Sequence, residues 1–284
     1  MKLLIASGKG GTGKTTVAVN LALAMAEKKI QLLDCDVEEP NAHLFLNPEY
    51  SSEVEIGIPV PSVDYSKCNF CGRCAEVCMF NALAVLKDQV MVLRELCHGC
   101  GSCAYLCPQK AIHEIECPIG QVEAGKAYQL DFIHGRLNPG EAMSPPLINA
   151  VKKAAAVDRI TIIDAPPGTS CPVVSAAAGC DYCLLVTEPT PFGLNDLDLA
   201  YQMVLKLGTP AGVLINRCDI GDCAVEDYCN NNGLPLLYKI PWDMDLARLY
   251  ARGEPVVLHI PVWKDRFREI FFHIQAARKV AMRR

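Results

Sequence analysis

A chain of 284 residues with a formal net charge of -5 can form one large α/β domain, alone or with a small insertion. Its acidic balance argues against an obligate nucleic-acid partner. No apolar run approaches the ~18 residues of a membrane-spanning helix. The first apolar run leads directly into a glycine-rich turn, which leaves no space for a signal peptide. We therefore expect a soluble, cytoplasmic protein.

The first predicted strand covers residues 2–6 and leads into the stretch SGKGGTGKTT, residues 7–16, and then a helix over residues 15–28. Glycines let backbone N–H groups converge on phosphate oxygens, and the N-terminus of the following helix adds positive potential. Lys14 can reach the β- and γ-phosphates, and the Thr15 hydroxyl can bind Mg²⁺. The stretch therefore predicts a phosphate-binding loop. Its predicted nucleotide ligands are Gly8, Gly10, Gly11, Thr12, Gly13, Lys14, Thr15 and Thr16.

A second apolar run, residues 30–34, ends in the triplet Asp34-Cys35-Asp36. Ligands of open α/β sheets bind outside the carboxyl ends of the strands, so these acids can bind a metal ion or a water molecule. Later apolar runs alternate with helical segments, which predicts a doubly wound, mostly parallel sheet of the α/β class. The runs cover residues 128–133, 159–164, 181–187, 212–216 and 234–240, with a helix start expected at Ser144 and Pro145.

The composition changes at residues 57–61 and again at Cys117 and Pro118. Both stretches contain proline, and the segment between them is dense in cysteine, which is typical of an insertion. We therefore predict a P-loop domain built from residues 1–61 and 118–284, interrupted by a small domain over residues 62–117.

The chain has 16 cysteines, and in a reducing cytosol this number indicates metal binding and not disulfides. The spacing C-x2-C-x2-C-x3-C occurs twice, at an offset of 29 residues. This spacing predicts two 4Fe-4S clusters, each held by three cysteines of one run and the last cysteine of the other. Zinc is the alternative, but a structural zinc site usually pairs two C-x2-C units. The first cluster would use Cys68, Cys71, Cys74 and Cys107, and the second Cys97, Cys100, Cys103 and Cys78.

The remaining cysteines show no clear ligand spacing. Cys180 and Cys183 form a lone C-x2-C at the start of an apolar strand, which favours packing in the core. A third metal site, shared at a dimer interface, is the alternative.

Residues 62–117 resemble a bacterial two-cluster ferredoxin over their whole length. Met79 is the one departure, because the first cysteine run of such ferredoxins normally has proline there. This departure removes no cluster ligand. The resemblance implies an inserted small α+β ferredoxin domain that transfers electrons.

Lys9 is unusual in a general P-loop and resembles the deviant Walker motif of the MinD, ParA and nitrogenase iron-protein superfamily. The resemblance covers nearly the whole chain and implies a Mg²⁺-dependent ATPase. In that family the lysine matched by Lys9 reaches the partner's nucleotide across a face-to-face dimer and supplies transition-state charge. Asp36 matches the aspartate that orients the attacking water. Asp164 matches the acid that holds Mg²⁺ through water.

The same resemblance assigns further nucleotide contacts. It places the Gly168 amide near the γ-phosphate, and it matches Asn216, Arg217, Pro241 and Trp242 to adenine-contacting positions. From the residues alone, Asn216 could equally cap a turn. We assign residues 188–191 loop and helix-cap roles.

These features predict an ATPase, slow by itself and stimulated by dimerisation or a partner, that couples ATP or ADP binding to an electron-transfer module. Cluster assembly or delivery, and MinD-like positioning on a surface, are the alternatives. The expected partners are a second copy or a related ATPase, bound in a nucleotide-dependent manner, and a redox or client protein.

The last predicted element is a helix over residues 261–284. Its apolar residues share one face, and basic residues occupy the rest. Such a helix can bind a membrane surface, but docking onto the protein core explains the pattern more simply, so membrane contact is not favoured. The apolar face comprises Trp263, Phe267, Ile270, Phe271 and Ile274.

Overall fold

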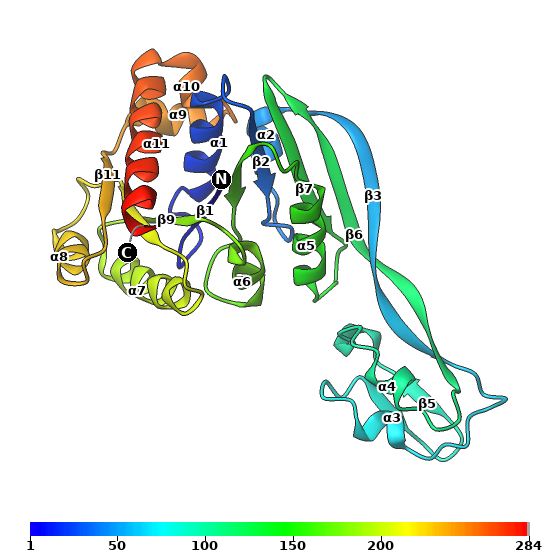
Figure 1. The fold of residues 1–284 in the computed structure, drawn as a ribbon. Coiled ribbons are helices and arrows are strands. Elements are labelled where there is room, and N and C mark those ends of the chain that lie inside the picture. The colour runs from blue at the N-terminus through cyan, green and yellow to red at the C-terminus, as the bar shows by residue number, and fades with distance from the viewer. Residues whose placement is uncertain (283–284) are drawn as a thin grey trace.

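The computed structural model describes residues 1–282 as a central sheet flanked by helices, with a small lobe at the end of a long β-ribbon (Figure 1). Within these residues the large sheet has nine strands in the order β11-β10-β9-β1-β8-β2-β7-β6-β3. Neighbouring strands from β11 to β7 pair in parallel, whereas β6 pairs antiparallel with both β7 and β3. The prediction of a doubly wound, mostly parallel α/β fold is confirmed.

The parallel strands are short and buried on both faces. In β1, Leu3 and Ile5 point into one apolar core, and Leu4 and Ala6 point into the other, as the two-residue period of a strand requires. The strands of the large sheet, parallel and antiparallel together, are β1 (Lys2–Ala6), β2 (Ile30–Asp34), β3 (Glu49–Val63), β6 (Ile112–Ala127), β7 (Leu130–Leu137), β8 (Ile160–Asp164), β9 (Tyr182–Thr187), β10 (Ala211–Asn216) and β11 (Leu236–Ile240).

Helices cover both faces of the sheet, as Figure 1 shows. The first layer consists of α1 (Lys14–Ala24), α2 (Ala42–Leu46), α9 (Met244–Ala251), α10 (Val256–His259) and α11 (Pro261–Ala281). The second layer consists of α5 (Ser144–Ala154), α6 (Cys171–Ala177), α7 (Pro191–Lys206) and α8 (Ala224–Asn231). The P-loop lies between β1 and α1, at the carboxyl edge of the sheet.

The ribbon of β3 and β6 connects this body to the lobe. The two strands pair from Glu49 opposite Lys126 to Val63 opposite Ile112, so they continue through both predicted domain borders, at residues 61/62 and 117/118. Only residues 64–111 lie beyond the end of the ribbon. The change in composition therefore falls inside the paired strands and not at a linker.

The lobe contains two short helices, a 3-10 turn and a small hairpin. The helices are α3 (Arg73–Glu76) and α4 (Ser102–Tyr105), the turn is Arg94–Leu96, and the hairpin strands are β4 (Leu83–Val85) and β5 (Val90–Val92). The 29-residue sequence repeat is also a repeat of backbone conformation. Gly72 and Gly101 precede the two helices with φ of 80° and 74°, and Asn81 and Lys110 follow them with φ of 53° and 48°.

Two predicted boundaries differ from the structure. The strand expected over residues 128–133 begins only at Leu130, because Tyr128 turns the chain with φ of 55° between β6 and β7. Ser144 is the first residue of α5, but its Oγ donates a hydrogen bond to Glu38 Oε1 at 2.9 Å and caps no backbone N–H.

The apolar face of α11 lies in the core of the first layer. All five of its predicted apolar residues are buried there, next to residues of α1. This contact explains the amphipathic pattern, so the pattern no longer supports a surface-binding helix; the last two residues of the predicted helix lie outside the described chain. None of the helices in residues 1–282 combines the length and apolar character needed to cross a bilayer.

Adjacent phenylalanines in α11 provide a test of this packing. Phe271 is fully buried and Phe272 is half exposed, and Lys28 Nζ lies over both rings. Phe271→Ala should lower the free energy of unfolding by about 3–5 kcal/mol, because it leaves a cavity. Phe272→Ala should cost less than about 1 kcal/mol. Equal losses in denaturant titrations of the two variants would contradict the assignment of the buried face.

Candidate functional site

The P-loop is shaped by contacts with the end of β10. Asn216 Nδ2 donates to the Thr12 carbonyl at 2.9 Å. A Cβ atom on Gly13 would lie 2.6 Å from this amide nitrogen, and Gly13 has φ of 96°, so only glycine fits here. Asn216 therefore supports the loop that precedes α1, in addition to lining the cleft beside it.

A cleft of about 410 Å³ opens between the P-loop and the ends of β10 and β11. This volume is within the usual range for small-molecule sites. Most of the predicted nucleotide ligands line it, together with the predicted catalytic residue Asp36: Gly10, Gly11, Gly13, Lys14, Thr15, Thr16, Asn216, Arg217, Pro241 and Trp242. Gly8, Thr12 and Gly168 are not among its lining residues. Sequence reasoning missed several others, among them Glu39, Asn41 and Tyr250.

Three carboxyl groups surround Lys14 at the carboxyl ends of β2 and β8. Burial raises the pKa of Asp34 to about 6 and that of Asp36 to about 7. Burial also raises the pKa of Asp164 well above its usual range and lowers that of Lys14. Asp34 accepts hydrogen bonds from the backbone N–H groups of Asp36, Asn41 and Ala42, so it shapes the loop that carries Asp36.

Several polar atoms here are buried without a protein partner. Both carboxylate oxygens of Asp164 and the Thr12 hydroxyl are examples. Unpartnered buried carboxylate oxygens are costly unless a ligand satisfies them, and Mg²⁺ with its waters requires oxygen donors. The Gly168 N–H donates to the Ser7 carbonyl at 3.1 Å, which joins the segment after β8 to the P-loop. The unpartnered oxygens of Asp164 and Thr12 fit a hydrated Mg²⁺.

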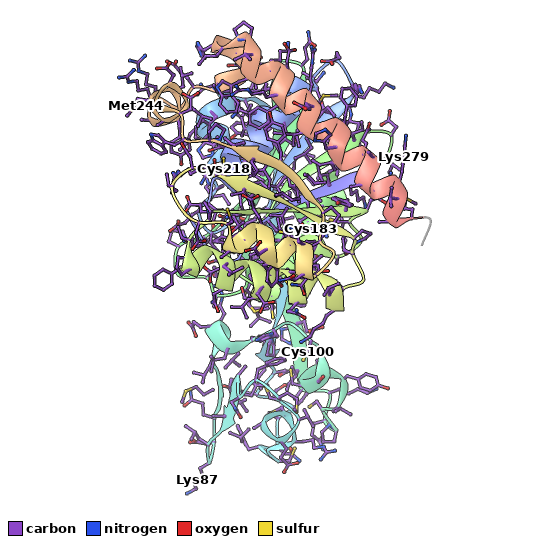
Figure 2. The ribbon with its side chains drawn as sticks, turned by 90° about the vertical axis from the view of Figure 1, so that its left-hand side faces the viewer. Lys87, Cys100, Cys183, Cys218, Met244 and Lys279 are labelled. Carbon is purple, nitrogen blue, oxygen red and sulfur yellow. The ribbon has the colours of Figure 1, made fainter. Side chains whose placement is uncertain are left out.

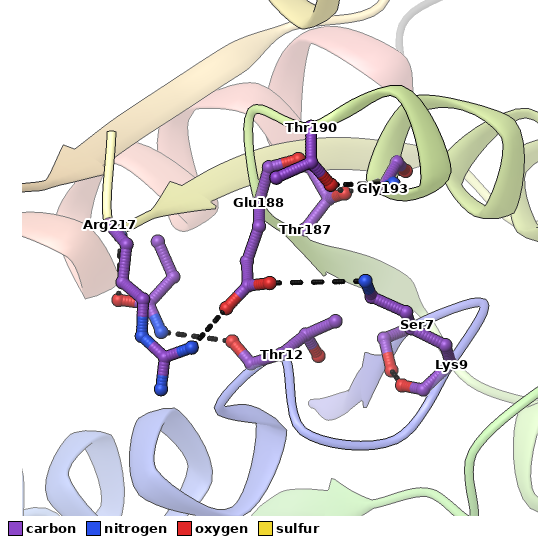
Figure 3. A network of polar contacts seen from close by, with 9 residues as sticks. Ser7, Lys9, Thr12, Thr187, Glu188, Thr190, Gly193 and Arg217 are labelled. Carbon is purple, nitrogen blue, oxygen red and sulfur yellow. Dashed lines mark hydrogen bonds and ion pairs between the residues drawn. The ribbon is translucent and has the colours of Figure 1, made fainter. Parts of the chain in front are cut away.

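Lys9 does not line the cleft. Figure 3 shows its side chain directed to Glu188, and Lys9 Nζ lies 3.9 Å from Glu188 Oε2. Glu188 Oε1 accepts a bond of 2.6 Å from Arg217 Nη1. Glu188 was predicted to have only a loop role; its strand-end position after an apolar run is the signal that could have indicated more.

The two cysteine runs form two separate hollows in the lobe. One is lined by Cys68, Cys71, Cys74 and Cys107, and the other by Cys78, Cys97, Cys100 and Cys103. Each hollow thus takes three cysteines from one run and the last from the other. The second hollow also borders the ribbon through Pro59, Pro61 and Glu114.

The last cysteine of each run accepts an equivalent hydrogen bond. Cys78 Sγ accepts from the Ala82 N–H and Cys107 Sγ from the Ala111 N–H, both at 3.3 Å. Such bonds to ligand sulfurs are one means by which proteins tune iron–sulfur clusters. In the described chain no three Cys, His, Asp or Glu side chains form a site for a single metal ion. Four cysteines line each hollow, which is the number of thiolate ligands that one 4Fe-4S cluster takes.

The cysteines of the body are free and distant from those of the lobe. Figure 2 shows Cys183 and Cys218 in the body and Cys100 in the lobe. Cys183 is fully buried in β9, and Cys180 Sγ donates to the Ala176 carbonyl at 3.4 Å. The prediction that this pair packs in the core is confirmed.

A glycine-rich loop between a buried strand and a helix, with acidic residues at neighbouring strand ends, defines a P-loop nucleotide-binding protein. The chain belongs to the CobQ/CobB/MinD/ParA nucleotide binding domain family, which it matches over residues 3–256.

Similar proteins include one from Methanocaldococcus jannaschii, MJ0579, at 32% identity over 264 residues, covering 89% of this chain and 90% of the relative. The iron-sulfur cluster carrier protein of Pyrococcus horikoshii is 27% identical over 284 residues, covering 91% of this chain and 79% of the relative. The cell division ATPase MinD of Pyrococcus furiosus has a similar fold, with a TM-score of 0.60 at 21% identity and coverage of 97% and 98%.

The raised pKa values of Asp34 and Asp36 predict that the stability of the folded protein decreases as the pH rises. The folded, nucleotide-free protein holds protons on these groups up to pH 6–7, whereas the unfolded chain loses them near pH 4. The folded state therefore binds more protons in this window, and its stability falls as the pH rises through it.

Thermal denaturation of the nucleotide-free protein between pH 5 and pH 8 measures this effect. In Asp36→Asn the loss of stability toward pH 8 should be clearly smaller than in the unaltered protein. Asp265→Asn, at an exposed position of α11, is the matched control and should keep the full slope. Parallel profiles for all three proteins would contradict the assignment.

Proposed function

We propose that this protein is an ATP-hydrolysing switch coupled to two 4Fe-4S clusters that transfer electrons. One observation carries the proposal: a single chain combines a P-loop cleft with two hollows, each lined by four cysteines. Neither feature alone would indicate coupling. The ribbon supports the proposed coupling, because its strands β6 and β3 follow β7 directly in the strand order of the large sheet.

In the proposed reaction the P-loop amides and Lys14 bind the β- and γ-phosphates. Thr15 and Asp164 would hold Mg²⁺, which would neutralise phosphate charge, while Asp36 would orient the attacking water. Lys9 acts in the nucleotide site of a second copy, so hydrolysis is slow in the free protomer. The buried carboxyls around Lys14 support this assignment, because a bound Mg²⁺ would compensate their charge and Lys14 would compensate that of the phosphates.

The lobe would hold the clusters. Cys68, Cys71, Cys74 and Cys107 would bind one, and the cysteines of the second hollow the other. Bound clusters supply one-electron transfer. Closed sets of four cysteines favour retained clusters, which is why we prefer electron transfer to cluster delivery.

Backbone and side-chain contacts connect the nucleotide cleft to the ribbon. Asp34 lies opposite His134 in the register of β2 and β7. The Leu137 N–H of β7 donates to the Val37 carbonyl at 2.9 Å, one residue after Asp36. His134 Nε2 and Glu123 Oε2 of β6 are 2.8 Å apart. A movement of the Asp36 loop would thus reach β7 and β6 directly.

Cluster delivery is the second candidate, because relatives bear the names iron-sulfur cluster carrier protein and iron-sulfur cluster transfer protein NUBPL. Anaerobic incubation of the loaded protein with an apo-ferredoxin distinguishes the two. Transfer of iron that requires ATP would favour delivery. Retention of iron, together with an ATP-dependent shift in cluster potential, would favour electron transfer.

The ATPase assignment predicts the effect of two substitutions. Lys14→Ala should remove Mg²⁺-ATP binding, and Asp36→Ala should retain binding but lower turnover by about 100-fold or more, since positioning of the water is lost. Phosphate release and equilibrium nucleotide binding measure the two effects. Asp265→Ala is the exposed control; undiminished turnover in Lys14→Ala would refute the enzyme assignment.

The cluster assignment predicts a difference between two double variants. Cys68→Ser with Cys107→Ser removes ligands of one hollow, and the iron content should fall from about eight atoms per chain to about four. Cys68→Ser with Cys78→Ser affects both hollows and should lower the content of both clusters. Iron analysis and electron paramagnetic resonance after anaerobic purification report the outcome. Cys171→Ser with Cys223→Ser, two exposed cysteines outside the lobe, is the control.

A further inference from the structure

Glu188 occupies an unusual position between two cations. Its side chain is nine-tenths buried, with Lys9 on one side and Arg217 on the other (Figure 3). The contact with Arg217 is short, at 2.6 Å, and the contact with Lys9 is long, at 3.9 Å. Lys9 therefore has the weaker of the two interactions.

A hydrogen-bonded turn fixes the backbone at Glu188. The Thr190 N–H donates to the Glu188 carbonyl at 2.8 Å, and Thr190 Oγ1 caps α7 by accepting from the Gly193 N–H. Thr187 Oγ1 donates to the Gly193 carbonyl at 2.9 Å. A Cβ atom on Gly193 would lie 2.2 Å from the Glu188 carbonyl oxygen, so the turn leaves no space for a larger residue.

We propose that Glu188 is a positioning residue that holds Lys9 within its own protomer until the dimer forms. This inference rests on the proposed function, in which Lys9 acts on the nucleotide of the second copy. In the free protomer Glu188 binds both cations. In the dimer Lys9 leaves, and Glu188 stays paired with Arg217.

Arg217 makes the release of Lys9 inexpensive. A buried carboxylate that loses its only partner carries a large penalty, but Glu188 retains the closer one. Arg217 is itself held beside the cleft, with its guanidinium 5.4 Å from the centre of the Trp242 ring. Glu188 therefore keeps Arg217 as its partner when Lys9 leaves.

Glu188→Gln should strengthen the dimer. The substitution removes the competing interaction of Lys9 in both protomers and leaves the size of the side chain unchanged. An ion pair with a partly exposed partner changes an equilibrium a few-fold, so the dissociation constant of the dimer with a non-hydrolysable ATP analogue should fall about three- to tenfold. The protein concentration that gives half-maximal ATPase rate should fall equally, and the maximal rate per protomer should stay within about twofold.

The experiment compares full-length Glu188→Gln with full-length Glu226→Gln. The control variant also loses a paired carboxylate, because Glu226 lies 3.0 Å from Lys239, but this ion pair does not include Lys9. Sedimentation measures the dimer. Labelling of lysine amines in the nucleotide-free protein, read by mass spectrometry, measures the availability of Lys9. It should rise in Glu188→Gln and not in Glu226→Gln. Glu188→Asp, which is too short to reach Lys9 but keeps the charge, should change both readouts in the same direction if the amide variant does not fold.

An unchanged or weaker dimer in Glu188→Gln would overturn the proposal, whatever the labelling shows. Unchanged labelling of Lys9 would also overturn it. Lys9→Ala tests the proposed function separately. If Lys9→Ala hydrolyses ATP at the full rate, the role of Lys9 in the second copy is wrong; if it does not, and Glu188→Gln behaves like Glu226→Gln, only the positioning role fails.

Discussion

The structure depends on a charge imbalance at the carboxyl edge of the sheet. Lys14 is buried among Asp34, Asp36 and Asp164, so the free protein has three acids around one base. Burial shifts these groups toward their neutral forms, and a bound Mg²⁺ would favour their charged forms. The loop that carries Asp36 also contacts β7, through the Val37 carbonyl and the Leu137 N–H. In the proposed function, this contact would link nucleotide binding to the geometry of the sheet edge.

The sheet edge offers a structural route for the proposed coupling between the cleft and the lobe. The lobe has only a small apolar core of its own, which includes Leu83, Val90, Cys103 and Ile112. Its connection to the body is a hydrogen-bonded ribbon and not a flexible linker, and Arg94 of the lobe also pairs with Glu141 of the body at 2.6 Å. Because β6 pairs with both β7 and β3, a displacement at β7 would be expected to move the whole ribbon.

Local sequence patterns were sufficient to predict the parallel strands of the core. Each short apolar run became a strand because both of its faces are buried, and the P-loop was evident from its glycines. The ribbon was not predicted, because residues 49–56 are mostly polar, residues 119–127 contain two glycines, and the two segments pair with each other far apart in the sequence. The division of the eight cysteines between two hollows followed from their spacing. The contact of Lys9 with Glu188 joins residues 179 positions apart and has no local signal.

The position of β3 at the edge of the described sheet has a consequence for solubility. An unprotected edge strand of 15 residues would offer a row of unpaired backbone groups to a second chain. Pro59 and Pro61 lie on alternate positions of this strand and lack the N–H groups that such an addition would use. Glu49, Glu53 and Glu55 place negative charge along the rest of the edge. The strand that carries the lobe is thus also protected against aggregation.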